Sequence, residues 1–521
     1  MTRPGGLWRT LAILSMWGLV VSIACQQPTT GAPSAQPTPA KTKLTIVLSA
    51  TVDFLDPHVT RRTEGFDVLV NVNEGLLARD PKTMQPIPAL ATSWQNPDAT
   101  TWIFKLRTGV KFHNGEAFDA DTVKYNFTRV VDPKLQSTIG ATLAGIVKQV
   151  DVVDPTTVKI TLSQPAPFFL ERIARFWFVP PKESAEKGND YVAQHPVGTG
   201  PYKFVEWKQQ QSVTLVRNED YWGTKPAFKD MVFREIIEYP TAIAELLAGN
   251  VDILATVPQD QIDAVNKSGK AKVQIVPSQV VVEVAFDQMG RTSKTPWTDK
   301  RVRQAANYAV DRESIAKNLM GGYGTPLPVS VSPLIFGYDG SIKPYPYDPN
   351  KAKQLLADAG FANGFDSDFR IYPLGSFIDE KLLAQAIASD LGKVGIRMKI
   401  IQVSSSEIGP LIREGKAGPA YIRQNENAGA FDVALGFSFL QKNGTFSYYL
   451  NEDVERLRLQ AASSTNPDER KKIYSDIQKI LYDDPPHIFG WAGFVLNGVA
   501  NTVDYPSQPD NATRLYLAKP K

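Results

Sequence analysis

The 521-residue sequence contains a single cysteine, Cys25, and only four histidines. One cysteine excludes an internal disulfide framework, and the histidines show no metal-ligand spacing such as HExxH. The sequence also has no GxSxG nucleophile elbow. Its Gly-Lys pairs at 392–393 and 415–416 lack the spacing and the following Ser or Thr of a phosphate-binding loop. We therefore expect no metal, no cofactor and no enzymatic activity.

The sequence also has no large excess of basic or acidic residues. Lys and Arg together number 57, and Asp and Glu together number 54. No basic run stands out, although binding to nucleic acid depends on clustered cations that neutralise phosphates. Nucleic acid is therefore not an expected partner.

The apolar run near the N-terminus, residues 11–21, is too short for a good transmembrane helix but has the length of a signal-peptide core. Arg3 and Arg9 precede it. Ser22-Ile23-Ala24-Cys25 follows and resembles a bacterial lipobox, with Ser22 where Leu is usual. We expect residues 1–24 to be a signal peptide and Cys25 to carry lipid. The alternative is an uncleaved anchor that ends at Cys25, and either case places the body outside the cytoplasmic membrane.

The next stretch, residues 26–40, has no charged side chain and four prolines. It cannot bury a core, so residues 25–40 are predicted to be a semi-extended, lipid-anchored linker. In polyproline geometry the linker would reach roughly 45 Å from the bilayer. That reach lets a globular body rotate over a membrane partner.

The remaining part, about 480 residues, is too long for one hydrophobic core and long enough for two or three lobes. Trp102, Phe104 and Leu106 alternate with their neighbours and predict a strand with one apolar face. Asn114-Gly115 is a hairpin signal, and Asp119 is placed to cap a following helix. Four further helix N-caps are predicted, at Asp299, Asp311, Asp348 and Asn466. This alternation of strand and helix predicts an α/β protein.

Three segments carry longer motifs. Residues 90–127 contain LAxSW followed by WxFxLRxGVKFHxGxxFxAxxVxxxF, residues 197–222 contain GTGPY and then NxxYW, and residues 298–322 predict two consecutive helices. Such long spacing of aromatic, Gly and His landmarks is more specific than a short motif. Together these segments resemble the family 5 bacterial extracellular solute-binding proteins, which are receptors of ABC importers for dipeptides, oligopeptides, nickel chelates and some sugars and opines.

The resemblance implies a two-lobed α/β fold of the periplasmic-binding-protein type (class II, cluster C) with an extra inserted domain. Lobe I would comprise residues 41–75, 197–279 and 488–521, the inserted domain residues 76–196, and lobe II residues 280–487. The solute would lie between the lobes, which close by hinge motion. The permease and the ATPase would be separate chains. We expect a monomer in the periplasmic space or at the cell surface.

Two matching segments also carry local expectations. Residues 71–80, with Glu74-Gly75-Leu76, resemble a helix that leads into the family's first crossover. Gly198 and Gly200 precede Pro201 and a strand, so they do not form a dinucleotide-binding loop, which opens a helix. These glycines are expected to allow a tight turn.

The solute-binding chemistry departs from that of peptide receptors. In peptide-binding members a WGWxxDxxxP segment places an aspartate against the ligand's ammonium group. The matching stretch here, residues 431–444, has Leu440 or Gln441 at that position. The loop at residues 373–376 also lacks the arginine that grips the carboxylate in dipeptide receptors. A buried ammonium without a counter-charge costs several kcal/mol, so zwitterionic dipeptides should bind poorly unless the register is shifted or Asp432 or Glu426 substitutes.

We therefore expect a peptide-like solute that is held by backbone hydrogen bonds and aromatic walls. The alternative within the same fold is an oligosaccharide, an opine or a nickel chelate. By their positions in matching segments, the expected pocket residues are Phe54 and Asn73 from the first lobe and Phe437, Phe439, Gln441 and Trp491 from the second.

Overall fold

The structure is a computed structural model that describes residues 41–374, 377–425, 431–442, 444 and 446–521. The predicted signal peptide, Cys25 and the linker therefore lie outside the described residues, as does Glu426. Within these ranges no helix is both long and apolar enough to cross a bilayer. Residues 41–521 belong to one unit, which is described by itself below.

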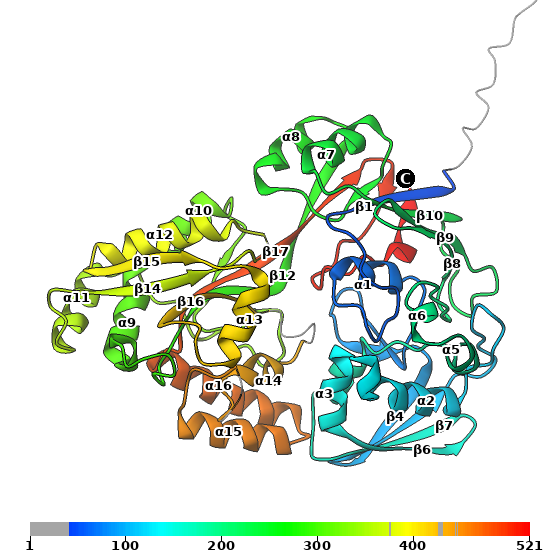
Figure 1. Ribbon diagram of the computed structural model, residues 1–521, viewed down its shortest axis with the longest axis horizontal. Coiled ribbons are helices and arrows are strands. Elements are labelled where there is room, and N and C mark those ends of the chain that lie inside the picture. Colours follow the sequence, from blue (N-terminus) through cyan, green and yellow to red (C-terminus); the bar gives the residue numbers. More distant parts are fainter. Residues whose placement is uncertain (1–40, 375–376, 426–430, 443, 445) are drawn as a thin grey trace, which may run out of the picture. The chain divides into compact units, whose positions relative to one another are not determined.

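An eleven-stranded mixed sheet runs through this unit (Figure 1). Its first strand group consists of β8 (Tyr202–Lys208), β9 (Ser212–Arg217), β10 (Asp230–Glu235), β1 (Lys43–Leu48) and β11 (Ile253–Leu254). Its second strand group consists of β16 (Ala420–Asn425), β14 (Phe365–Ile371) and β15 (Ile396–Gln402). Two long antiparallel strands, β12 (Ala271–Phe286) and β17 (His487–Ala500), join the groups, and the short β13 (Thr325–Pro326) pairs with β17.

The two joining strands pair from Ala271 opposite Ala500 to Ala285 opposite His487. The pairing requires glycine where the backbones approach closely, since a Cβ at Gly490 would lie 1.8 Å from the carbonyl oxygen of Val282. Three residues of β12, Ser278 to Val280, stand opposite Gly493 alone, which makes a wide bulge. Both strand groups are thus built on one ladder, which this bulge interrupts in its middle and a second register shift interrupts between Val282 and Val284.

Helices cover one face of the second strand group, whereas Asp366, Asp368, Arg397 and Lys399 on the other face of β14 and β15 are exposed. One apolar core packs against α7 (Tyr239–Ala248), α8 (Ile262–Lys267), α9 (Lys300–Ala309), α10 (Arg312–Leu319), α11 (Pro349–Asp358) and α12 (Glu380–Gly392). A second core packs against α14 (Val433–Gly436), the 3-10 helix η5 (Phe437–Leu440), α15 (Glu452–Ser463) and α16 (Pro467–Asp483). The helix α13 (Ser405–Arg413) follows β15.

The predicted strand with one apolar face is confirmed as β5 (Thr101–Leu106), in which Trp102, Phe104 and Leu106 are buried. It belongs to a separate sheet with β4 (Ala91–Asp98), β7 (Thr157–Leu162) and β6 (Val147–Asp154). The helices of this region are α2 (Ala120–Val130), α3 (Thr138–Ile146), α4 (Phe169–Ile173), α5 (Pro181–Lys187) and α6 (Asn189–Val192). The hairpin signal at Asn114-Gly115 forms only a tight turn closed by the bridge between Lys111 and Ala117. The boundaries given above for the lobes and the inserted domain stay predictions.

The five helix caps named above are confirmed. The Asp119 carboxylate accepts a hydrogen bond from the Thr122 backbone N–H at 2.9 Å, and Asp299, Asp311, Asp348 and Asn466 cap α9, α10, α11 and α16 in the same way. A capping side chain satisfies backbone donors that the first turn leaves free, which is why local sequence predicts these starts.

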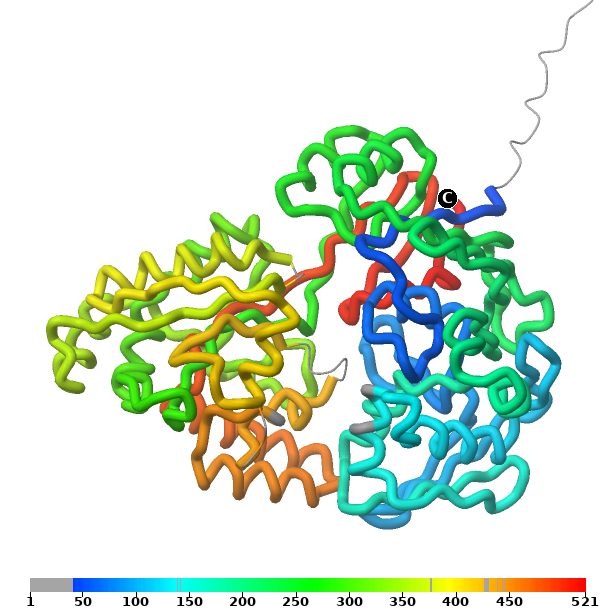
Figure 2. Tube along the Cα trace, viewed as in Figure 1, coloured from blue at the N-terminus to red at the C-terminus, as the bar shows by residue number. Residues whose placement is uncertain are grey.

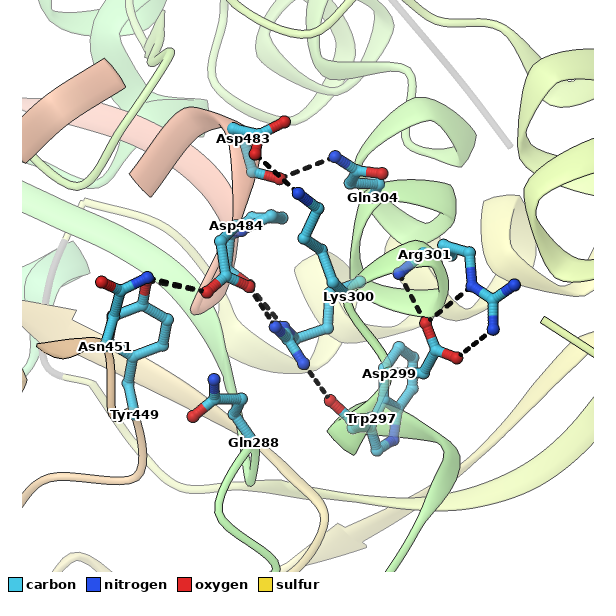
Figure 3. A network of polar contacts seen from close by, with 12 residues as sticks. Gln288, Trp297, Asp299, Lys300, Arg301, Gln304, Tyr449, Asn451, Asp483 and Asp484 are labelled. Carbon is cyan, nitrogen blue, oxygen red and sulfur yellow. Dashed lines mark hydrogen bonds and ion pairs between the residues drawn. The ribbon is translucent and has the colours of Figure 1, made fainter. Parts of the chain in front are cut away.

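A polar network ties the end of α16 to the start of α9 (Figure 3). Asp484 pairs with the buried Arg303, and its Oδ2 accepts a hydrogen bond from the Tyr449 hydroxyl at 3.1 Å. Arg303 also donates to the carbonyl of Trp297 at 2.7 Å. The network anchors β17 at its beginning, because His487 follows Asp484 by three residues.

Glu74 joins three sequence motifs into one hydrogen-bonded unit. Its carboxylate accepts hydrogen bonds from Thr199 Oγ1 at 2.8 Å, Tyr221 Oη at 2.8 Å and Trp222 Nε1 at 2.9 Å. Glu74 lies in a turn after α1 (Thr63–Leu69) and before β2 (Leu77–Arg79), which pairs with β3 (Pro86–Pro88). The helix expected over residues 71–80 is therefore wrong, because this acid is needed as an acceptor in a turn.

The glycines of GTGPY are required by a close approach to the same turn. A Cβ at Gly198 would lie 2.0 Å from the carbonyl oxygen of Val72, and a Cβ at Gly200 would lie 2.6 Å from it. Gly200 N–H donates to that same oxygen at 2.9 Å. The expected tight turn is thus a contact between two backbones.

The C-terminal segment packs on α1, although more than four hundred residues separate them (Figure 2). It includes β18 (Val503–Asp504), which pairs with β19 (Lys519–Pro520). Thr513 N–H donates to Asp67 Oδ1 at 3.0 Å, and Asn71 Nδ2 donates to the Thr513 carbonyl at 3.0 Å. The chain end is therefore part of the first strand group's packing.

Burial raises the pKa of Asp67 to about 7, against the opposing effect of the hydrogen bonds from Thr513. Because the folded carboxyl binds its proton more tightly than the unfolded one, stability is lost as pH rises from about 4 to about 7. We expect Asp67→Asn, which keeps the acceptor for Thr513, to raise the free energy of unfolding by about 2 kcal/mol at pH 8 and to leave it unchanged at pH 4. Urea unfolding at both pH values measures this, with the exposed Asp504→Asn as control. A loss of stability at pH 8 would contradict it.

Candidate functional site

The directions of the strands bring two sets of loops face to face. β1 is parallel to β10 and β11, and β11 is antiparallel to β17. β16 is antiparallel to β12 and parallel to β14, which is parallel to β15. The carboxyl ends of β1, β10 and β11 therefore point toward the second strand group, and those of β14, β15 and β16 point back toward the first. We name these two sets of strand ends the facing edges.

Ligands of open α/β sheets bind outside the carboxyl ends of the parallel strands, so the facing edges are the candidate site. The first strand group contributes the loops at residues 49–62, 236–238 and 255–258. The second contributes residues 372–379 and 403–404, of which 375 and 376 lie outside the described residues. The loop after β16, residues 426–430, also lies outside them.

Phe54 is presented by the loop that follows β1, and 43% of its side chain is exposed. Asp53 holds this loop in shape, since its carboxylate accepts hydrogen bonds from Phe54 N–H at 2.8 Å, Thr60 Oγ1 at 2.7 Å and Arg61 N–H at 2.9 Å. A large exposed apolar side chain on a fixed loop suits contact with a solute. Of the six expected pocket residues, Phe54 is thus placed at a facing edge.

Aromatic side chains gather beside the bulge of β12. The ring of Phe377 covers Gly493, where a Cβ would lie 2.0 Å from Phe377 Cε1. Phe494 packs against Phe377 with ring centroids 5.0 Å apart and against Tyr323 at 5.5 Å. Tyr323 is 41% exposed, so this cluster offers an apolar wall near the second facing edge.

Two expected pocket residues are placed inside the protein. Trp491 is fully buried, pairs with Val282 and donates from Nε1 to the carbonyl of Arg312 at 3.0 Å. Asn73 is buried and donates from Nδ2 to the carbonyls of Phe178 at 3.0 Å and Val197 at 3.3 Å. In this structure both side chains have packing partners within the chain.

The stretch expected to correspond to WGWxxDxxxP forms the short helices α14 and η5, whereas the strand beside β12 is β16. Phe437 is fully buried between these helices and α16, Phe439 is buried, and Gln441 is exposed. The three residues are near neighbours in sequence but differ in their access to solvent.

Asp432, the alternative counter-charge for a ligand's ammonium group, already has partners within the chain. It forms an ion pair with Arg470, and its Oδ1 accepts hydrogen bonds from Ala434 N–H at 2.9 Å and Tyr474 Oη at 3.3 Å. Burial raises the pKa of Asp432, and the Arg470 cation opposes that shift. Next to it, Phe431 N–H donates to Glu171 Oε2 at 3.1 Å, which links α4 to this region.

A buried charged cluster lies behind Phe439. The Arg423 guanidinium stacks on the Phe439 ring at 3.9 Å, and its Nε lies 3.6 Å from the buried Glu283. His487 Nδ1 lies 3.2 Å from Glu283 Oε2 and 2.8 Å from Ser330 Oγ. Burial lowers the pKa of His487, and the neighbouring Glu283 carboxylate opposes that shift.

This cluster was missed by sequence reasoning because its members come from four separate elements. A signal was present, since Glu283 interrupts the apolar run Val280–Phe286 and Arg423 directly follows the apolar start of β16. Charged residues inside buried strands are almost never unpaired. The cluster borders a chamber of about 10 Å³, which holds at most one water molecule.

A groove of about 550 Å³ lies elsewhere. It is lined by polar and charged residues of β14, β15 and the loop at 292–296, among them Asp366, Arg370 and Lys399. Most of its strand residues lie toward the amino ends of β14 and β15, away from the facing edges, so its volume alone does not make it the solute site. In the described ranges no group of three or more His, Cys, Asp or Glu side chains is arranged to hold a metal.

Comparison with known proteins agrees with this architecture. The family model for bacterial extracellular solute-binding proteins, family 5 (middle region), matches residues 85–452. The chain belongs to this family. Its members are solute-binding components of ABC transporters and are not enzymes, and the family 5 protein described here is extracytoplasmic.

The family 5 chain is 31% identical to heme-binding protein A of Haemophilus influenzae, covering 77% of this chain and 78% of that protein. It is 29% identical to glutathione-binding protein GsiB of Pectobacterium atrosepticum, covering 88% and 90%. The solved structure of HbpA2 from Haemophilus parasuis superimposes with a TM-score of 0.83 at 24% identity, over 92% of this chain and 100% of that one. The predicted α/β fold of the periplasmic-binding-protein type is thereby confirmed.

Proposed function

We propose that the protein captures a peptide-like solute between the facing edges and delivers it to the permease of an ABC importer. The proposal rests on the direction of the strands. β1, β10 and β11 run opposite to β14, β15 and β16, so two sets of carboxyl-end loops face one another. The exposed Phe54 and the aromatic cluster around Phe494 supply apolar walls, as a small-molecule site requires. The similarity to glutathione-binding proteins supports a peptide-like solute, since glutathione is a tripeptide.

A second candidate is a non-peptide solute such as an oligosaccharide, an opine or a nickel chelate. It is favoured by the engagement of Asp432 with Arg470 and by the absence of an acid at Leu440 and Gln441. Within residues 431–442 Asp432 is the one acidic residue, so this segment offers no uncommitted carboxylate for an ammonium group. The similarity to a heme-binding protein also points away from a strict requirement for a peptide.

The test is a thermal-shift screen of residues 41–521 against dipeptides, tripeptides including glutathione, longer peptides, oligosaccharides, heme and nickel chelates. A ligand present at a hundred times its dissociation constant stabilises the folded state by about 2.7 kcal/mol. We expect the largest shift with a peptide-like compound. A shift with only sugars, heme or chelates would replace the first candidate with the second.

The proposal includes attachment to the membrane through lipid on Cys25, with residues 25–40 as the linker. The lipobox-like sequence before Cys25 and the absence of charge in the linker support it. The proposed pocket also keeps the other expected residues, at the positions described above. They are Phe437, Phe439, Gln441 and the buried Asn73 and Trp491.

A further inference from the structure

The bulge of β12 lies at the level of the second facing edge. Pro277 pairs with Phe494 and Val281 pairs with Ala492, so Ser278, Gln279 and Val280 have only Gly493 opposite them. Val281 also pairs with Asn425, the last residue of β16. The bulge therefore sits where β12 leaves the first strand group and meets the carboxyl end of a strand of the second.

Within the bulge, Gln279 is 4% exposed, and its side-chain Oε1 is buried without a hydrogen-bond partner. Its two neighbours in the bulge make hydrogen bonds. Ser278 Oγ accepts a hydrogen bond from Val280 N–H at 3.1 Å, and the Ser278 carbonyl accepts one from Ser332 Oγ at 3.1 Å. A buried acceptor without a donor destabilises a fold, and native proteins rarely retain one without a reason.

Asn73 also has an unpartnered buried Oδ1, but its Nδ2 is held by the backbone carbonyls of Phe178 and Val197. No such bond from the Gln279 amide to a described residue is found. A carboxamide carries one acceptor and two donors, which is the complement of a peptide group with its C=O and N–H. Gln279 is thus suited to recognise an amide.

We propose that Gln279 is a solute-binding residue whose Oε1 accepts a hydrogen bond from an N–H of an amide-containing solute. The inference rests on the proposed function and narrows it, because it assigns an amide group of the solute to the bulge of β12. A solute with neither an N–H nor an O–H group would leave this oxygen unpartnered, and a sugar hydroxyl would satisfy Oε1 but not the donors of the amide.

The test compares Gln279→Leu with the wild-type protein, using reduced glutathione and the dipeptide Met-Leu as probes in calorimetric titrations. Leucine matches the size of the side chain but removes its polar atoms. We expect the affinity for a probe that binds the wild type to fall at least tenfold, because the solute's N–H loses its acceptor. The melting temperature of the solute-free variant should equal or exceed that of the wild type, since an unpartnered acceptor has been removed.

Gln478→Leu is the matched control. Gln478 is fully buried, but its amide donates to the carbonyl of Gly337 at 2.7 Å and accepts from Asp339 N–H at 3.1 Å. This variant should lower the melting temperature and leave the affinity unchanged.

Three outcomes overturn the inference. Unchanged affinity of Gln279→Leu would remove Gln279 from the site while the proposed function stands. A melting temperature lowered as far as that of Gln478→Leu would show that its oxygen has a structural partner such as water. Failure of both probes to bind the wild-type protein would count against the proposed peptide-like solute itself, and the inference would fall with it.

Discussion

Glu74→Ala lowers the free energy of unfolding by about 3–5 kcal/mol, because three donors, the buried Thr199 and the half-buried Tyr221 and Trp222, lose their common acceptor. The hydroxyls of Thr199 and Tyr221 and the indole N–H of Trp222 all point to this one carboxylate. Burial raises the pKa of Glu74, against the effect of these donors, so part of the loss is offset by removal of a buried acid. The net effect remains large since each unpaired donor costs about 1–3 kcal/mol.

Urea unfolding of residues 41–521, followed by tryptophan fluorescence, measures the change, and a lower midpoint at an unchanged slope is expected. Glu219→Ala is the matched control. Glu219 belongs to the same NEDYWG segment, but its side chain is 54% exposed and pairs with Arg217 at the surface. An exposed ion pair contributes at most about 1 kcal/mol. Equal losses from the two variants would refute the central role of Glu74.

Arg470→Met lowers the free energy of unfolding by about 3–5 kcal/mol, because it leaves the Asp432 carboxylate buried without its cation. The side chains of Arg470 and Asp432 are 7% and 4% exposed. The aliphatic part of methionine keeps contact with Phe336, over which the guanidinium now lies at 4.7 Å. The decrease in the free energy of unfolding therefore measures the effect of the unpaired charge rather than that of a cavity.

The double variant Asp432→Asn with Arg470→Met should recover most of this loss, since Asn keeps the cap on α14 and carries no charge. The defect of the single variant should also shrink as pH falls. A carboxyl whose folded pKa is raised stabilises the folded state below the unfolded pKa and loses that contribution as pH rises. Urea unfolding at pH 5 and pH 8 measures both effects. A double variant as unstable as the single one would show that Arg470 acts through packing instead.

Local chemistry is what the sequence predicts well. Asp119, Asp348 and Asn466 cap helices because a short polar side chain reaches the backbone N–H groups that directly follow it. The strand at 101–106 follows from its alternation, since one face is buried. These features depend on neighbours in sequence and need no knowledge of the tertiary structure.

The parts that sequence reasoning missed depend on distant partners. Residues 431–437 contain the apolar pattern of a strand, but the place beside β12 is taken by β16, so the segment turns into α14 instead. Glu283, Arg423 and His487 are widely separated in sequence and become a cluster only through the order of β16, β12 and β17. Gln279 stands out only because its buried Oε1 has no hydrogen-bond donor, and no sequence pattern predicts a missing partner.

The position of β17 has a consequence for the time at which the protein can fold. This strand lies at the centre of the large sheet but is encoded by residues 487–500 of 521, and the segment that packs on α1 is later still. A ribosome must therefore synthesise β17 before β12 and β11 can be joined and the two strand groups united in one sheet. Contacts of such long sequence separation form slowly. For an extracytoplasmic protein, a sheet that closes late favours passage of the chain across a membrane before the native state forms.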